Sequence, residues 1–440
     1  MAAFVRDYRA AAGGRQLALV ARGAGWQNGR WLELSGPGLR ARRRLRPAIR
    51  ALGLGHDAYR RCVAAWAHEH RVEHILLSSL IGHDLSVLEL GVPVTYVVHD
   101  LFPFCTTLLA ETPQGVCHTC TRAEHRDCVA IQPDSHRFGP TGPSWYAGLD
   151  RLRSLLVSGD VRIVAPSRFA ATRFRQLAGV DVSVSVVPHG TALAKQDLWR
   201  EARGPARVLV LGAISSDKGL ARYAELMGAL RGRVEFHLLG SGGEARSLRP
   251  LAHTFVSRYA PAHLADHVRR IGPSAALLLS PAPETFGYVL AELRAMSIPP
   301  IVVRGNAYVE QVDDSIGVVL DRAPTPAELS RVLETTDWSA LHARLAKAPV
   351  RSARDMVSDY KALIERRPSA AERAGRDAGA ASLAADARPS RDSSGVGAPP
   401  LQPVVADLAD LAAGALAHRG WPRASRALSR LSARLGRRLE

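Results

Sequence analysis

Lysine is nearly absent from this chain of 440 residues, in which four lysines stand beside 54 arginines. Long apolar runs are also absent, because no stretch reaches the ~18 apolar residues that a membrane-spanning helix needs. The opening residues, MAAFVRDYRAAAGG, lack the apolar core of a secretory signal. We therefore expect a protein that is made and kept in the cytoplasm. Its length and its 47% hydrophobic content are enough for two or three domains.

The formal net charge of +17 is compatible with nucleic acid, an anionic membrane surface or an acidic substrate as a partner. The basic residues concentrate at 40–46 (RARRRLR) and in the last twenty residues. Neither segment interleaves its charges with the aromatic side chains on which single-stranded bases stack. The sequence therefore disfavours a nucleic-acid binder, and the excess of arginine over lysine is typical of a bias in nucleotide composition.

Cysteine is scarce, yet four of the five cysteines fall within 24 residues. The pair in Cys117-x-x-Cys120, with a thiol on either side, could provide the ligands of a structural zinc. The spacing of the outer cysteines matches no standard zinc finger, and disulfides are not expected in a reducing compartment. A structural zinc and reduced loop thiols therefore both stay open. The candidate ligands are Cys105, Cys117, Cys120 and Cys128, with His118 and His125 as alternatives.

Predicted strands and helices alternate between about residues 15 and 365, which is typical of parallel sheets covered by helices on both faces. The sequence therefore predicts an α/β fold with two Rossmann-like, doubly wound domains facing across a cleft. The first domain spans 1–195 and the second spans 205–365. The predicted strands of the first are 16–21, 75–80, 94–98, 161–166 and 184–188. Those of the second are 207–213, 234–239, 275–280, 299–303 and 316–320.

The composition changes after residue 365. Residues 366–402 are rich in Ala, Arg, Ser, Pro and Gly and predict a disordered linker. Residues 403–440 predict a basic helical tail, in which leucines repeat at three and four positions within 422–439. Such a helix suits peripheral contact with the inner face of a membrane. Docking on the parent domain or on a partner explains the pattern equally well.

Two carboxylates eight positions apart stand in the stretch SPAPETFGYVLAELRAM. Glu284 lies where a predicted strand turns into a helix over 286–296, and Glu292 lies about two helical turns further on. The free amides at a helix start suit a diphosphate. Lys218 begins a second predicted helix, 218–230, where its charge could neutralise the same diphosphate. A chance pairing on a solvated helix face is the alternative interpretation.

The order of several motifs resembles a known family. The glutamate spacing in ETFGYVLAE is similar to the E-x7-E signature of retaining family-four glycosyltransferases of the GT-B fold, also called glycosyl transferases group 1. Further segments agree in the family's order over about residues 15–365. They are VTYVVHD (94–100), IVAPSRF (163–169), VSVVPHG (184–190), VLVLGAISSDKG (208–219) and FHLLGSG (236–242).

The resemblance implies a hexosyltransferase-like enzyme of class EC 2.4. It would move a sugar from a nucleotide-sugar donor to a glycan or lipid-linked acceptor with retention, in surface polysaccharide or glycoconjugate biosynthesis. It implies no cofactor for catalysis. The implied catalytic residues are His99 and Glu284, whereas His189 and Gly190 belong to the interdomain junction. The implied donor-binding residues are Gly212, Lys218, Gly219, Glu284, Thr285, Phe286, Gly287, Tyr288 and Glu292.

The chain departs from the family pattern in two places. Ala213 stands where the family has the arginine of a GR-x4-KG pattern, and Arg304 is a candidate substitute for the missing cation. The chain also begins inside what resembles the helix that follows the family's first strand and glycine-rich loop. Both departures favour the alternative hypothesis, a catalytically weak binding or scaffold protein of the same fold.

Overall fold

A computed structural model describes residues 2–23, 29–132 and 143–365 of the chain. The predicted linker at 366–402 and the predicted basic tail at 403–440, including 422–439, lie outside the described residues. None of the helices in the described part is long and apolar enough to cross a membrane.

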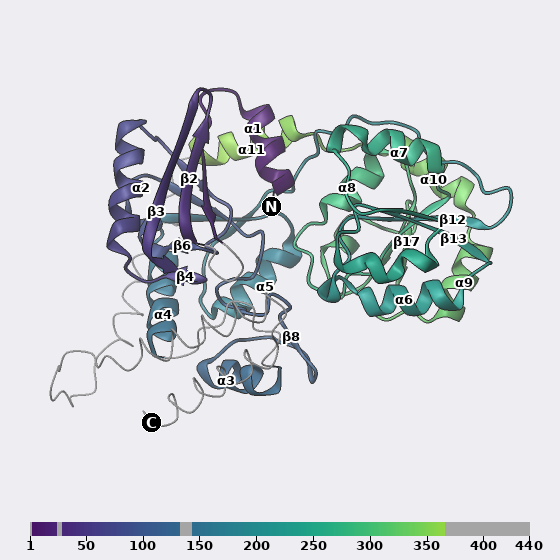
Figure 1. The fold of residues 1–440 in the computed structure, drawn as a ribbon, viewed down its shortest axis with the longest axis horizontal. Helices are drawn as coiled ribbons and strands as arrows, with labels where there is room; N and C mark the ends of the chain where they lie inside the picture. Colours follow the sequence, from purple (N-terminus) through teal and green to yellow (C-terminus); the bar gives the residue numbers. More distant parts are fainter. Residues whose placement is uncertain (1, 24–28, 133–142, 366–440) are drawn as a thin grey trace. The chain divides into compact units, whose positions relative to one another are not determined.

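A sheet of six parallel strands forms the second half of the described chain (Figure 1). If its strands are numbered along the chain, their order across the sheet is 3-2-1-4-5-6, which is the Rossmann order. The neighbouring strands β12 and β15 therefore mark the switch point, where the order reverses direction. The strands are β12 (Ala206–Leu211), β13 (Val234–Leu239), β14 (Thr254–Val256), β15 (Ala275–Leu278), β16 (Pro300–Val303) and β17 (Val318–Leu320).

Helices cover both faces of this sheet, because its central strands are apolar on both sides. One face packs against Leu226 of α6 and Leu329 of α9, and the other packs against Val268 of α7 and Leu293 of α8. All four side chains are fully buried. These helices are α6 (Leu220–Ala229), α7 (Leu264–Ile271), α8 (Tyr288–Ala295) and α9 (Pro326–Thr335), and α10 (Trp338–Lys347) follows them. Helix α9 begins after Thr325, whose side chain accepts from the amide of Glu328 and so caps the first turn.

A second parallel sheet lies in the first half of the chain, in the order β11-β10-β7-β5. Its strands match four of the predicted ones: β5 (Ile75–Leu77), β7 (Val94–Val97), β10 (Val161–Ala165) and β11 (Val184–Val186). The helices around it are α2 (Asp57–Glu69), α4 (Pro143–Val157) and α5 (Arg168–Ala178). Helix α5 is bounded by Ser167, whose side chain caps its first turn, and by Gly179 in the left-handed conformation.

One predicted strand has a different role from the one expected. Strand β1 (Ala18–Arg22) pairs antiparallel with β2 (Gly29–Gly36), which pairs with β3 (Leu39–Ile49), so β1 belongs to a separate three-stranded sheet. The sheet has one apolar face, which buries Leu32 and Leu34. All five arginines of 40–46 lie exposed on β3.

The last described helix packs on the first half of the chain. Helix α11 (Ala353–Glu365) lies beside α1 (Ala2–Ala12), as Figure 1 shows. Met356 and Tyr360 of α11 share a buried cluster with Val97 and Val164 of the first parallel sheet. Residues 353–365, which the sequence assigns to the second domain, thus contribute to the core of the first. The α/β class with parallel sheets is confirmed.

Candidate functional site

A cavity of about 260 Å³ opens at the switch point of the Rossmann-ordered sheet. Open α/β sheets bind their ligands at this place, outside the carboxyl ends of the strands. The walls come from the ends of β12 and β15, from the turn that leads into α8, and from His99 and His189 of the first half of the chain. Seven of the predicted donor-binding residues line it, namely Gly212, Lys218, Glu284, Thr285, Phe286, Gly287 and Tyr288.

Lys218 and Glu284 form an ion pair at this cavity. Lys218 ends the 3-10 turn η3 (Ser216–Lys218), and its Nζ donates to Oε1 of Glu284. The lysine side chain keeps 37% of its exposure and the glutamate 19%, so both ends remain open to a ligand. An ammonium group and a carboxylate side by side can bind the phosphate and the hydroxyl parts of one molecule.

The turn ETFG is shaped by the close approach of its backbone to the ring of Tyr308. Gly287 has φ +86°, and a Cβ atom there would lie 2.3 Å from Cε1 of Tyr308. Only glycine fits this conformation without strain. Helix α8 begins directly afterwards, and no capping side chain is found there among the described residues. Its first amides are therefore available to an anion.

His99 and His189 approach each other at the wall of the cavity. Nε2 of His189 and Nδ1 of His99 are 3.4 Å apart. Burial, followed by the neighbouring His189, holds the pKa of His99 well below its ordinary value, and burial lowers the pKa of His189 to about 3. Both rings are therefore neutral at physiological pH. Nε2 of His99 is buried and has no hydrogen-bond partner within the described ranges.

Glu292 does not line the cavity. Its carboxylate, half-buried on α8, interacts instead with Arg6 and Asp7 of α1. Burial raises the pKa of Glu292 to about 7, although the charge of Arg6 opposes this rise. The two glutamates of the E-x7-E spacing thus have different surroundings, and the donor-binding role of Glu292 stays a prediction.

Two other residues that the sequence places at the donor site also lie outside the cavity wall. Gly219 precedes α6 in the left-handed conformation, where a Cβ atom would lie 3.0 Å from the carbonyl oxygen of Leu279. It therefore lets α6 approach the end of β15. Arg304, the candidate substitute for the cation missing at Ala213, faces Asp321 at 3.7 Å and is not part of the cavity wall. Among the described wall residues Lys218 is the sole lysine or arginine.

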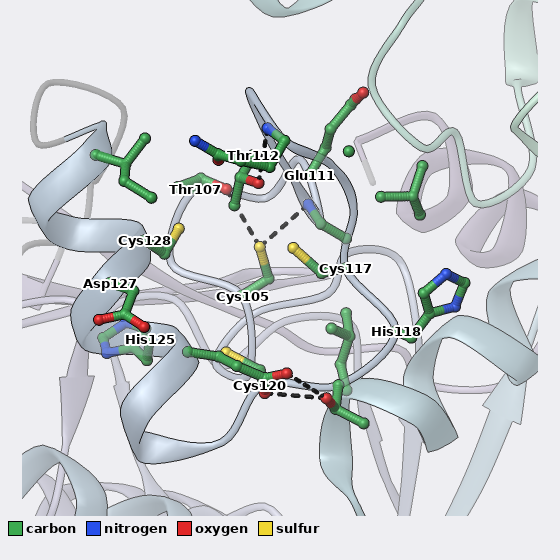
Figure 2. A pocket seen from close by; sticks show the side chains of 18 of the residues that line it. Cys105, Thr107, Glu111, Thr112, Cys117, His118, Cys120, His125, Asp127 and Cys128 are labelled. Carbon is green, nitrogen blue, oxygen red and sulfur yellow. Dashed lines mark hydrogen bonds between the residues drawn. The ribbon is translucent and has the colours of Figure 1, made fainter.

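The four clustered cysteines line a different cavity, of about 460 Å³ (Figure 2). It is enclosed by the loop after β7, the hairpin of β8 (Glu111–Thr112) and β9 (Gly115–Val116), and α3 (Arg122–Ile131). Sγ of Cys105 accepts from the amide of Ala110, and Sγ of Cys128 accepts from Nε2 of Gln132. Burial raises the pKa of Cys117 to about 11 and that of Cys120 to about 12.

In its described part the structure shows no arrangement of these thiols around a metal ion, and the zinc ligands stay a prediction. Within the ranges that the structure describes, no group of three or more His, Cys, Asp or Glu side chains is arranged to hold a metal ion. Zinc binds thiolates, whereas burial favours the protonated thiol here. His125 is committed elsewhere, because its ring contacts the hydroxyl groups of Thr106 and Tyr146. The arrangement favours reduced thiols over a structural zinc.

Several residues that shape the main cavity were not predicted. The hydroxyl of Tyr223 donates to the carbonyl of Leu277 and accepts from the amide of Leu279, which fixes the end of β15. Asn306 donates to the carbonyl of Ser280 and holds the next turn. The sequence indicates these residues only through their position, since Tyr223 and Asn306 lie in segments that follow strands ending at the cavity edge of the sheet.

Neither models of known protein families nor curated proteins match the chain. Solved structures resemble it in fold. HepE of Anabaena, in complex with UDP and glucose, is 15% identical with a TM-score of 0.47, over 70% of this chain and 81% of its own. Sucrose-phosphate synthase of Thermosynechococcus elongatus is 15% identical with a TM-score of 0.48, over 70% and 75%. A glycosyltransferase of Rickettsia africae is 13% identical with a TM-score of 0.45, over 70% and 82%.

Proposed function

We propose that this protein is a retaining glycosyltransferase of the GT-B type, which takes a sugar from a nucleotide-sugar donor. The observation that carries the proposal is the Lys218–Glu284 pair at the switch-point cavity. The family resemblance assigns these two positions to the donor. The lysine and the first amides of α8 would stabilise the charge that develops on the departing diphosphate. Glu284 and the neutral His99 would hold the hydroxyls of the sugar.

The acceptor is proposed to be a glycan or lipid-linked molecule of surface polysaccharide or glycoconjugate assembly. This part of the proposal rests on the family resemblance, as do retention and the predicted contact of 422–439 with a membrane. The front-face attack that the resemblance implies leaves the departing phosphate to assist removal of the acceptor's proton. It needs no carboxylate nucleophile and no metal ion.

The first experiment is a thermal-shift screen of the full chain against UDP-, GDP- and dTDP-sugars. A donor that binds the folded protein raises its melting temperature by mass action. The donor that shifts it is then tested for nucleotide release, with Glu284→Ala as the control. Release by the original chain that exceeds release by Glu284→Ala supports the proposal. Equal background release in both proteins contradicts it.

A second candidate function is donor binding without turnover. The position of Arg6 favours it, because the charge of this guanidinium acts on a carboxylate that the resemblance assigns to the donor. Ala213 favours it as well, since the diphosphate then has one cation fewer. A thermal shift without nucleotide release would identify this function, whereas release above the Glu284→Ala background would exclude it.

A further inference from the structure

The backbone of the ETF turn is held at three consecutive carbonyl groups. The carbonyl of Glu284 accepts from the amide of Ala307 at 3.0 Å. The next, of Thr285, accepts from the hydroxyl of Ser167 at 2.7 Å. The third, of Phe286, accepts from Nε2 of Gln311 at 2.6 Å. Two of these donors come from the 3-10 turn η6 (Ala307–Glu310) and its next residue, and the third lies more than a hundred residues earlier in the chain.

The same 3-10 turn also holds the start of α5. The carboxylate of Glu310 accepts from the amides of Arg168, at 2.9 Å, and Phe169. These are the first two residues of α5, whose amides have no partner within their own helix. A carboxylate at this place gains both charge-assisted hydrogen bonds and the attraction of the helix dipole. Glu310 therefore links the second half of the chain to the first.

A third contact joins the turn to the wall of the cavity. The hydroxyl of Thr285 donates to the carbonyl of His99 at 3.0 Å. Ser167 joins the turn to α5, because the hydroxyl that donates to the carbonyl of Thr285 also accepts from the amide of Ala170. Thr285 is the immediate neighbour of Glu284. Loss of any of these contacts would therefore shift the backbone that carries the Glu284 side chain and change its position relative to His99.

We propose that Ser167, Thr285 and Glu310, with the first turn of α5, form an interdomain joint that positions Glu284. When these contacts are formed, η6 holds the start of α5 and the ETF turn together, and Glu284 lies at the sugar position opposite His99. When it opens, the turn loses its anchor and the cavity widens for the donor. Glu310 is thus a positioning residue for the sugar site, and this inference rests on the proposed function for its catalytic consequence.

The size of the cavity agrees with a joint that must open. Its volume of about 260 Å³ lies below the roughly 300–1,000 Å³ of ordinary small-molecule sites. Separation of its two walls would bring it into that range. A second link, in which Arg322 donates to both Glu111 and the carbonyl of Pro281, joins the same two halves of the chain.

The joint itself is tested by hydrogen exchange in the full chain without any ligand. Glu310→Gln keeps the shape of the side chain but removes its charge, and we expect faster exchange in peptides that span 166–171 and 283–288. Asp314→Asn is the matched control, because Asp314 is an exposed carboxylate close by in the sequence. Exchange in Glu310→Gln that equals the original chain at both segments would overturn the proposal, whether or not the protein transfers sugar.

The catalytic consequence is tested with the donor that the thermal-shift screen identifies. In Glu310→Gln and Ser167→Ala we expect kcat to fall by about tenfold or more, because misplacing a catalytic group by about 1 Å can cost up to a hundredfold. Binding of the nucleoside diphosphate, measured by calorimetry, should stay within about threefold, since its contacts are unchanged. Ser167→Thr retains the hydroxyl and should restore kcat.

The outcomes separate the joint from the proposed function. If the original chain neither binds nor transfers from any sugar nucleotide, the proposed function fails, and the exchange experiment still decides whether Glu310 couples α5 to the ETF turn. If the original chain transfers sugar and Glu310→Gln retains its kcat, Glu310 is not a positioning residue. A parallel loss of nucleotide binding and kcat would mean a general loss of structure and would also contradict the proposal.

Discussion

The charge of Arg6 on α1 acts on the carboxylate of Glu292 on α8, and Asp7 holds the Arg6 guanidinium in place. Nε of Arg6 donates to Oδ1 of Asp7 at 2.6 Å, and the charge of Glu292 raises the pKa of Arg6 further. Tyr288 and Tyr259 also interact with Glu292. The half-buried carboxylate thus has one cation and one anion near it, and burial determines its pKa.

The raised pKa of Glu292 predicts a pH-dependent stability. Because the folded protein binds this proton more tightly than the unfolded chain, the stabilisation is complete below about 4.5 and is lost as the pH rises through about 7. Glu292→Gln stays neutral at every pH. We therefore expect its free energy of unfolding, relative to that of the original chain, to rise between about pH 5 and about pH 8. Denaturant unfolding at both pH values measures this. A difference in unfolding free energy between the two proteins that stays the same at both pH values would contradict it.

Affinity for the donor should increase as the pH rises, whereas stability decreases. If the ionised carboxylate of Glu292 accepts from ribose hydroxyls, the affinity for the nucleotide increases as the pH rises through about 7. Calorimetric titration at several pH values checks this, with Glu292→Gln as the control that removes the dependence. Asp100, whose pKa burial raises to about 6, is present in both proteins and cancels in the comparison.

The ion pair at the cavity predicts two separable defects. Glu284→Gln should lower the rate of transfer by about a hundredfold, the size of effect seen when one preorganised polar group is removed from an active site. Lys218→Ala should weaken binding of the nucleoside diphosphate by about tenfold or more, because a charge-assisted hydrogen bond is lost. Lys347→Ala is the matched control, since Lys347 is exposed on α10. Lys218→Ala that binds as tightly as Lys347→Ala would refute the assignment of the lysine.

Substitution of Gly287 should cause a structural defect that substitution of Gly228 does not. In Gly287→Ala the alanine must adopt a left-handed backbone conformation, and its methyl group meets the ring of Tyr308. We therefore expect a loss of about 1–3 kcal/mol in the free energy of unfolding. Gly228 lies within α6, and a Cβ atom there would meet nothing within 4 Å. Gly228→Ala should therefore stabilise the protein, by up to about 1 kcal/mol. Equal effects of the two substitutions in thermal or denaturant melts would be inconsistent with the strained turn.

The cysteine cavity predicts slow thiol chemistry. The pKa values of Cys117 and Cys120, raised to about 11 and about 12, leave few thiolates at neutral pH. Alkylation by iodoacetamide, followed by peptide mass spectrometry, should therefore be slow near pH 7 and accelerate strongly above about pH 9. Elemental analysis of the same preparation serves as the check on metal. Close to one zinc per chain would restore the zinc interpretation and contradict the arrangement of the thiols.

The local parts of the candidate site could be predicted from the sequence. The turns after β12 and β15 follow short apolar strands and precede helices, so the periodicity alone places Lys218 and Glu284 at one edge of a parallel sheet. The position of Gly287 follows from the same reasoning, because a helix start close to a strand end leaves little room for a side chain.

The parts that could not be predicted depend on contacts between distant segments. Glu310 contacts α5 across a sequence separation of more than a hundred residues, and a single sequence holds no trace of that pairing. The antiparallel sheet was missed for a different reason. On β3 the arginines flank Leu45 and hide the alternation of buried and exposed positions, so the sequence indicates only a charged segment where the structure has a paired strand.

The chemistry of the Glu310 contact affects how freely the two halves of this chain could be exchanged with those of other proteins. On the α5 side the carboxylate meets main-chain groups, which every sequence supplies in the same way. A chimera that joins a foreign second half to residues before 190 would keep this one contact if the grafted 3-10 turn ended in an acid.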